Sequence, residues 1–201
     1  MELGMIGLGR MGANMAERLQ RGGHRLICTS RTRETVDEAV KRGLTGVYSV
    51  AELVAQLTAP RAVWLMVPAG EATDQMLAKV TPLLQRDDIV VDGGNSYYGD
   101  TVRRAGELKE RGLGFVDVGT SGGIWGLTEG YSLMVGGEEE TVEYLRPLFE
   151  TLAPAPDKGW GRVGPSGAGG YSGSARRSSI IHTRCPPRSA VSIRPVVGAI
   201  E

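Results

Sequence analysis

The stretch GLGRMGANMA, residues 7–16, decides the class of fold. It follows Leu3–Gly7, a short apolar run typical of a buried strand, and leads into Met15, Ala16 and Leu19, which have helical spacing. Its glycines follow the pattern G-x-G-x-x-G. Between a strand and a helix, this pattern is typical of a loop that binds the pyrophosphate of a dinucleotide. The stretch therefore predicts a strand–loop–helix unit with a cofactor site at its loop.

Each glycine of this motif has its own expected role. Gly7 permits the tight turn after the strand, Gly9 lets the backbone approach a pyrophosphate, and Gly12 lets the helix pack on the strand. The helix N-terminus adds N–H donors and a partial positive charge. The alternative is a glycine-rich turn that binds nothing, and the flanking strand and helix favour cofactor binding over it.

Apolar strands alternate with amphipathic helices along the chain. The expected strands are Leu3–Gly7, Leu26–Thr29, Ala62–Val67, Ile89–Asp92, Phe115–Val118 and Leu133–Val135. The longer expected helices are Thr73–Leu84, Asp100–Arg111 and Glu138–Leu152, and Ser49 with Glu52 forms a capping box that opens a shorter one. The alternation predicts an α/β fold, a doubly wound (Rossmann) parallel sheet with helices on both faces. We expect this domain to span residues 1–169.

Composition excludes some classes of partner. Lysines and arginines balance the acids at 23 each, so charge gives no argument for binding nucleic acid or a membrane surface. No apolar stretch is long enough to span a bilayer, and the N-terminus lacks the pattern of a signal peptide. We therefore expect a cytoplasmic protein. Cys28 lies in an apolar run and is expected to be a buried thiol.

The last part of the chain differs in composition from the rest. Residues 1–165 hold 18 of the 23 basic and 22 of the 23 acidic residues, whereas later residues hold five arginines and the terminal Glu201. No helical or strand period continues beyond Gly169, so residues 170–201 are expected to form an irregular, poorly ordered tail. His182 and Cys185 are too few to ligate a metal, and we expect no metal site.

The end of the second expected strand bears on the choice of cofactor. An NAD site usually has Asp or Glu there to bind the ribose hydroxyls, but this strand ends in Thr29, Ser30, Arg31 and Thr32. Arg31 can pair with a 2′-phosphate, and the neighbouring hydroxyls can donate hydrogen bonds to it. The residues therefore favour NADP over NAD. The alternative is that Arg31 is a solvated loop arginine.

Four stretches together resemble the decarboxylating 6-phosphogluconate dehydrogenases of the pentose phosphate pathway. They are GLGRMGANMA (7–16), MVPAG (66–70), DGGNSYYGDT (92–101) and GTSGGIWG (119–126), with a weaker fifth, GPSGAG (164–169). The DGGNS stretch is the specific one, because related β-hydroxyacid dehydrogenases share the first motif and a Ser-Gly-Gly. The resemblance implies NADP-dependent oxidation and decarboxylation of 6-phosphogluconate to ribulose 5-phosphate, by an enzyme that forms homo-oligomers.

The resemblance also implies roles for individual positions. Cofactor contacts are implied for Gly7, Gly9, Met11, Gly12, Arg31, Thr32, Val67, Pro68, Ala69 and Asn95. Substrate contacts are implied for Asn95, Ser121, Gly122 and Gly123. From the residues alone, Asn95 equally suits a turn that satisfies its own backbone, and the Ser-Gly-Gly equally suits a flexible loop.

The proton-transfer groups that the family uses have no counterpart here. The resemblance implies a lysine and a glutamate on helices after the GPSGAG turn, but no lysine follows Lys158 and the only later acid is Glu201. The family's helical domain, which forms the main dimer interface, is also missing from the tail. We therefore expect no catalytic residue, and cofactor binding without autonomous turnover.

An interrupted reading frame is favoured over a divergent terminus as the origin of the tail. Another β-hydroxyacid dehydrogenase is the alternative activity.

Overall fold

The computed structural model describes residues 1–170. The expected tail, 170–201, lies outside these residues except for Gly170, and His182 and Cys185 lie outside them as well. Within residues 1–170, no helix has the length and apolar character needed to cross a membrane. The same residues contain no group of three or more His, Cys, Asp or Glu side chains placed to hold a metal ion.

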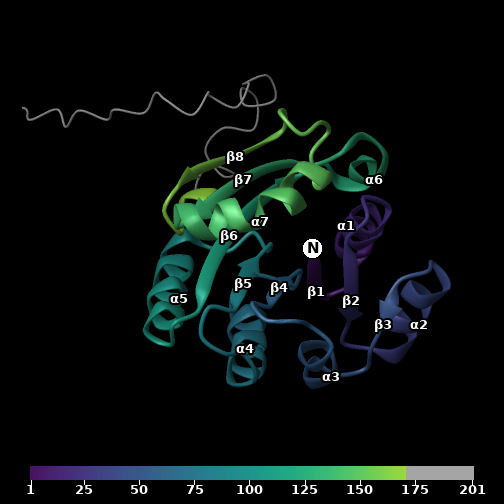
Figure 1. The fold of residues 1–201 in the computed structure, drawn as a ribbon, viewed down its shortest axis with the longest axis horizontal. Helices are drawn as coiled ribbons and strands as arrows, with labels where there is room; N and C mark the ends of the chain where they lie inside the picture. The colour runs from purple at the N-terminus through teal and green to yellow at the C-terminus, as the bar shows by residue number, and fades with distance from the viewer. Residues whose placement is uncertain (171–201) are drawn as a thin grey trace, which may run out of the picture.

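One eight-stranded sheet forms the centre of the molecule (Figure 1). Its strands are β1 (Glu2–Ile6), β2 (Arg25–Thr29), β3 (Thr45–Gly46), β4 (Ala62–Leu65), β5 (Ile89–Asp92), β6 (Gly114–Ser121), β7 (Ser132–Gly137) and β8 (Trp160–Gly164). Their order across the sheet is β3-β2-β1-β4-β5-β6-β7-β8. The first six strands in this order are parallel, which is the arrangement of a doubly wound dinucleotide-binding sheet.

The last two strands run opposite to the others. β7 pairs antiparallel with β6, and β8 pairs parallel with β7. The parallel sheet expected from the sequence is confirmed from β3 to β6, and the described sheet turns antiparallel only at this edge. Only residues 122–131 connect β6 to β7, and they form short helices, η2 (Gly123–Trp125) and α6 (Gly126–Glu129). A parallel return needs a crossover of a dozen or more residues, so the short connection turns the chain back antiparallel.

Longer helices cover both faces of the sheet, as the sequence predicts (Figure 1). They are α1 (Arg10–Arg21), α2 (Arg33–Lys41), α3 (Val50–Ala55), α4 (Glu71–Val80), α5 (Tyr98–Glu110) and α7 (Glu139–Leu152). The Ser49 cap of α3 is confirmed, because Ser49 Oγ accepts a hydrogen bond from the Glu52 N–H at 3.1 Å. The Glu52 carboxylate accepts in return from the Tyr48 N–H at 3.1 Å, one residue before the N-cap of a reciprocal capping box. The chain after α4 tightens into the 3₁₀ helix η1 (Thr81–Leu83), where Pro82 cannot continue an α-helix.

Alternating strand residues divide the core into two apolar clusters. Met5 and Trp64 face the helices α1 and α7, whereas their neighbours Ile6 and Val63 face α3, α4 and α5. This alternation is what a sheet covered on both faces requires. Cys28 belongs to the first cluster, and burial raises the pKa of its thiol to about 12, so it packs as an unreactive apolar side chain.

Candidate cofactor-binding site

A cleft of about 690 Å³ lies at the carboxyl ends of the central strands. Backbone hydrogen bonds bring these ends together: the Gly7 N–H donates to Thr29 O at 2.9 Å, and the Gly93 N–H donates to Leu65 O at 2.9 Å. The lining residues are Gly7, Leu8, Gly9, Ser30, Arg31, Thr35, Met66, Val67, Pro68, Ala69, Gly93, Gly94 and Asn95. In open α/β sheets, ligands bind at this edge, where the strand order reverses direction.

The three glycines of the first motif meet different surroundings. Gly7 has φ +103°, and a Cβ there would lie 2.4 Å from the carbonyl oxygen of Met66. A Cβ at Gly12 would lie 2.1 Å from the carbonyl oxygen of Gly7, so helix and strand need that glycine to pack. A Cβ at Gly9 would meet no atom within 4 Å. The fold therefore explains Gly7 and Gly12, and the open space at Gly9 is what close approach of a ligand requires.

The N-terminus of α1 begins at this open glycine. Gly9 is the N-cap, provides no side-chain hydrogen bond, and is followed by no acidic residue in the first turn. By contrast, Thr32 caps α2 and Ser49 caps α3 with their hydroxyl oxygens. The first N–H groups of α1 and its dipole thus face the cleft without a carboxylate or hydroxyl from the described chain. This arrangement suits an anion such as a pyrophosphate.

The loop after β2 carries the residues expected at a 2′-phosphate. Arg31 and Ser30 line the cleft, and the Arg31 guanidinium has no hydrogen bond or ion pair with any other residue in 1–170. Ser30 Oγ accepts a weak hydrogen bond from the Leu8 N–H at 3.4 Å. Thr32 is placed differently from the expectation, because its hydroxyl caps α2 and Thr35 takes its place in the cleft wall.

The loops after β4 and β5 form the other end of the cleft. Val67, Pro68, Ala69 and Asn95 line it, as expected. A Cβ at Gly93 would lie 2.2 Å from Trp64 Nε1, so the loop packs directly on the strand beneath it. The alternative for Asn95, a turn residue serving its own backbone, is not favoured. The neighbouring aspartate of the same motif performs that task, and Asn95 is exposed toward the cleft.

A buried polar network lies behind these two loops, and the sequence analysis missed it. Asp92 Oδ1 accepts from the Gly94 N–H at 3.0 Å, and Asp92 Oδ2 accepts from Ser96 Oγ at 2.7 Å. Arg104 of α5 donates to Ser96 Oγ at 3.2 Å. Burial raises the pKa of Asp92, and the hydrogen bonds from Ser96 and Gly94 oppose that rise. Asp92 and Ser96 of the DGGNS stretch thus shape the loop, while Asn95 between them stays available.

The remaining expected residues lie outside the cleft wall. Met11 is half-buried and packs against the apolar cluster under α1. Ser121 ends β6 and is exposed, and Gly122 and Gly123 follow with positive φ of +147° and +51°. The structure therefore brings the expected cofactor residues together, Met11, Gly12 and Thr32 excepted. It places the Ser-Gly-Gly at the end of β6, the strand next to β5, and in the turn that follows it.

A second buried carboxylate holds the GPSGAG stretch, and the sequence analysis missed this one too. Asp117 of β6 accepts hydrogen bonds from the Gly167 N–H at 2.7 Å and the Gly170 N–H at 3.0 Å. Burial raises the pKa of Asp117, and these backbone hydrogen bonds oppose the rise. Asp117 is the register partner of Asp92, so two buried carboxylates on neighbouring strands each anchor a glycine-rich loop.

The cleft provides positioning groups rather than proton-transfer groups. Arg31 is the one ionisable side chain among the residues that line it in the described chain. An arginine stays protonated at all physiological pH values and therefore cannot serve as a general base. The geometry can bind and orient a dinucleotide, but general acid–base chemistry needs groups from elsewhere.

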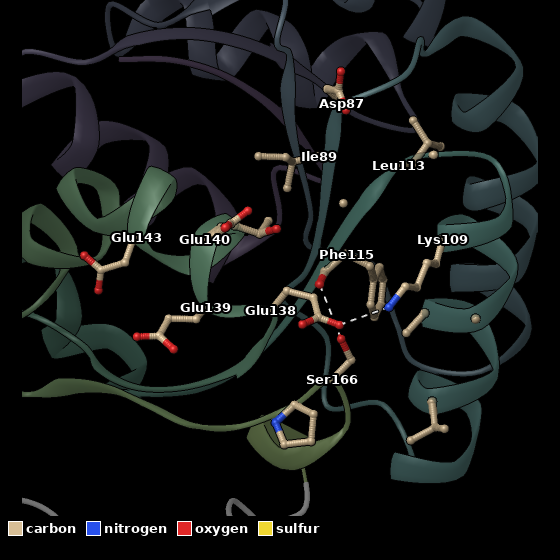
Figure 2. A pocket seen from close by; sticks show the side chains of 17 residues that line it. Asp87, Ile89, Lys109, Leu113, Phe115, Glu138, Glu139, Glu140, Glu143 and Ser166 are labelled. Atoms are coloured by element: carbon tan, nitrogen blue, oxygen red, sulfur yellow. Dashed lines mark hydrogen bonds and ion pairs between the residues drawn. The ribbon is translucent and has the colours of Figure 1, made fainter. Parts of the chain in front are cut away.

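A larger depression of about 1210 Å³ lies away from this cleft, between α5 and the start of α7 (Figure 2). Figure 2 shows its floor at Phe115 and its rim at Glu138, whose carboxylate accepts from Lys109 Nζ at 3.3 Å. Glu139 and Glu140 extend the rim over the first turn of α7. Carboxylates at a helix N-terminus offset the helix dipole, which accounts for this acidic rim without a ligand.

The parallel sheet, the glycine motif and the cleft at the strand ends define an NAD(P)-binding domain of the Rossmann type. Residues 2–161 match the family described as the NAD binding domain of 6-phosphogluconate dehydrogenase. The chain belongs to this family.

Relatives with both cofactor preferences are similar to this chain. It is 44% identical over 171 residues to the NAD(+)-dependent, decarboxylating 6-phosphogluconate dehydrogenase of Haloferax volcanii, covering 85% of this chain and 56% of that protein. It is 40% identical over 179 residues to the NADP(+)-dependent enzyme of Bacillus subtilis, covering 85% of this chain and 38% of that protein. The solved 6-phosphogluconate dehydrogenase of Plasmodium falciparum superposes with a TM-score of 0.79 at 30% identity, covering 85% of this chain and 38% of that one. The chain thus spans about half, or less, of the length of these relatives.

Proposed function

We propose that this chain binds NADP(H) in the cleft between Gly9, Arg31 and Asn95. We further propose that it is the cofactor domain of an enzyme that oxidises and decarboxylates 6-phosphogluconate to ribulose 5-phosphate. On its own the chain binds the cofactor and has little or no dehydrogenase activity.

The observation that carries cofactor binding is the empty space at Gly9. A glycine that the packing does not require lies at the uncapped start of α1, within a cleft at the strand ends. A pyrophosphate there would accept hydrogen bonds from the first N–H groups of α1. No other element of the described chain places a negatively charged group at the N-terminus of α1.

The preference for NADP over NAD is supported by charge. Arg31 projects a guanidinium without a partner in residues 1–170 at the adenosine end of the cleft, and none of the described residues that line the cleft is a carboxylate that could bind a ribose 2′-hydroxyl. A 2′-phosphate would gain a charge-assisted hydrogen bond from Arg31. The chain is similar both to a relative named as NAD-dependent and to one named as NADP-dependent. The cofactor preference is therefore argued from the residues of the site.

The substrate is proposed from the family and from Asn95. The exposed amide of Asn95 lines the cleft, and it can both donate to and accept from a polyhydroxy acid. Ser121, Gly122 and Gly123 would extend the substrate site on β6. None of the described residues that line the cleft is a general acid or base, which supports binding without turnover.

One experiment tests both halves of the proposal. Purified chain is titrated with NADPH and NADH by calorimetry, then incubated with NADP⁺ and 6-phosphogluconate while NADPH absorbance and CO₂ release are followed. We expect tighter binding of NADPH than NADH and no turnover above background. Efficient turnover would overturn the claim of binding alone, and failure to bind either cofactor would overturn the proposed function.

A further inference from the structure

Arg104 is a fully buried cation that joins several separate chain segments. Its side chain is 0% exposed. Its Nε donates to Asp74 Oδ1 of α4 at 2.8 Å, and its Nη2 donates to the carbonyl oxygen of Gly70 at 3.0 Å. Its Nη1 donates to Ser96 Oγ at 3.2 Å and lies 3.6 Å from Asp92 Oδ2. One guanidinium thus contacts α4, the loop after β4, and the end of β5 with the loop that follows it.

The two loops that Arg104 joins are the two that close one end of the cleft. Gly70 directly follows the lining residues Val67–Ala69, and Ser96 directly follows the lining residues 93–95. Arg104 itself does not line the cleft. Any influence on a ligand must therefore act through the position of these loops.

Stability alone is a weak reason for a buried arginine here. Moving a cation out of water costs on the order of several kcal/mol, and well-packed apolar residues often replace buried ion pairs with no loss of stability. What a guanidinium provides and an apolar side chain cannot is a planar fork that fixes several acceptors at once. Hydrogen bonds from Arg104 lower the pKa of Asp74 to about 2, with a smaller contribution from Arg103, so the guanidinium favours the charged form of Asp74.

The sheet order decides which part of a dinucleotide lies against these loops. Along the edge, the strands run β2-β1-β4-β5. Arg31 after β2 marks the adenosine end, and the glycine motif after β1 lies at the pyrophosphate. The loops after β4 and β5 then lie at the nicotinamide end, on the far side of the pyrophosphate from Arg31.

We propose that Arg104 is a positioning residue for the nicotinamide half of the cofactor site. It acts through Gly70 and Ser96 to hold the loop of Val67–Ala69 against the loop of Asn95. This inference rests on the proposed function, since it takes the cleft to be a dinucleotide site. Because Arg104 touches nothing at the adenosine end, its loss should weaken a whole dinucleotide and spare a ligand that fills only the adenosine end.

The test compares two ligands on matched variants. NADPH occupies the whole cleft, whereas adenosine 2′,5′-bisphosphate lacks the nicotinamide half. Calorimetry measures both on wild type, Arg104→Met and Arg104→Lys. The control is Arg103→Met, which removes the adjacent, half-exposed arginine that shares Asp74 but contacts neither loop. We expect Arg104→Met to weaken NADPH about tenfold or more and adenosine 2′,5′-bisphosphate by less than about twofold. The lysine variant should lie between, because an ammonium cannot reproduce the fork.

Four outcomes would count against the proposal, and they are distinguishable. Equal weakening of both ligands, or unchanged NADPH binding, would overturn the positioning role of Arg104. Weakening of NADPH by Arg103→Met to the same degree would overturn it as well. If wild type binds neither ligand, the proposed function falls, and the role of Arg104 with it. Should Arg104→Met not fold, Ser96→Ala removes one link of the same network and must show the same selective loss of NADPH.

Discussion

Gly9 differs from Gly7 and Gly12 in what a side chain at its position would meet. The latter two are confined by backbone atoms of the same fold, at 2.4 Å and 2.1 Å from an added Cβ, whereas Gly9 faces open space. The backbone of Gly9, with φ −61° and ψ 176°, is also one that any residue adopts. Folding therefore explains two of the three glycines, and a bound pyrophosphate explains the third.

Gly9→Ala should separate binding from folding. The methyl group would meet no protein atom, so the free energy of unfolding should change by no more than about 1 kcal/mol; a poorer N-cap and a less flexible unfolded chain oppose each other. NADPH binding should fall by about tenfold or more, because the methyl occupies the space of the pyrophosphate. Calorimetry with NADPH and a urea melt measure the two effects.

Gly12→Ala is the matched control for that variant. Its methyl would clash with the Gly7 carbonyl oxygen, so unfolding should become easier by about 1–3 kcal/mol. If Gly9→Ala instead destabilised the fold as much as Gly12→Ala does, the open space at Gly9 would have no connection with a ligand.

Arg31→Ala should change cofactor preference. The loss of one charge-assisted hydrogen bond to a 2′-phosphate costs about 1–3 kcal/mol, so NADPH binding should weaken about 5- to 150-fold. NADH, which lacks that phosphate, should bind nearly as before. Arg33→Ala is the control, since Arg33 stacks on the Tyr48 ring at 4.5 Å and does not line the cleft. Equal losses for NADPH and NADH would contradict a 2′-phosphate role for Arg31.

Single residues differ in how far their role can be predicted from the sequence. Arg31 could be predicted, because it stands where a strand end usually carries a carboxylate. Arg104 could not, because an arginine within an amphipathic helix is ordinarily a solvated residue, and only the fold shows that this one is buried. Asp92 and Asp117 belong to quoted or adjacent stretches. Their side chains are buried because they accept hydrogen bonds from the glycine-rich loops that they anchor. Sequence spacing does not show these hydrogen bonds.

Elements were predicted best where a period or a cap defines them. The six strands expected from apolar runs all exist, and Ser49 caps α3 as expected. β3 has two residues and β8 mixes glycine with arginine, so neither carries a strand pattern. The direction of β7 depends on the length of its connection to β6, which an apolar pattern does not encode.

His24 connects the start of β1 with the end of α7. The Thr151 hydroxyl donates to the Pro147 carbonyl at 2.9 Å, so its oxygen accepts from His24 Nε2 at 2.8 Å. His24 Nδ1 then carries no proton and accepts from the amino group of Met1 at 3.2 Å. Burial lowers the pKa of His24, and the positive charge of that amino group lowers it further. Burial and the hydrogen bond with the Met1 amino group therefore favour the neutral form of His24.

This geometry predicts a specific pH dependence. The pKa of His24 is below 6.5 in the folded chain and near 6.5 in the unfolded chain, so the unfolded state binds more protons under mild acid. The stability contributed by neutral His24 is fully present above pH 6.5 and is lost as the pH falls through the lower folded-state pKa. Urea melts from about pH 8 down to about pH 5 should show this loss in wild type and a smaller loss in His24→Gln. Identical pH profiles for the two proteins would contradict it.

At the scale of the whole molecule, the cleft is formed by loops that follow four strands of the sheet. Side chains of these strands pack in both apolar clusters. Residues after β1, β2, β4 and β5 form its wall, while the helices behind those loops pack on opposite faces of the sheet. A ligand bound across the wall would contact segments that separate only when the domain unfolds. Cofactor binding should therefore stabilise the entire domain.

Thermal shift measures this coupling and separates cofactor from substrate. A ligand that binds only the folded state at about 100 times its Kd adds about 2.7 kcal/mol, which raises the Tm of a domain of this size by about 5–11 °C. NADPH should produce such a rise. 6-Phosphogluconate alone should produce none. Among the described residues that line the cleft, Arg31 at the adenosine end is the one cation, and Ser121–Gly123 lie apart from the cleft. A rise with 6-phosphogluconate alone would mean that Asn95 and the Ser-Gly-Gly form a substrate site without further residues. In that case the chain would retain more of the family's activity than cofactor binding.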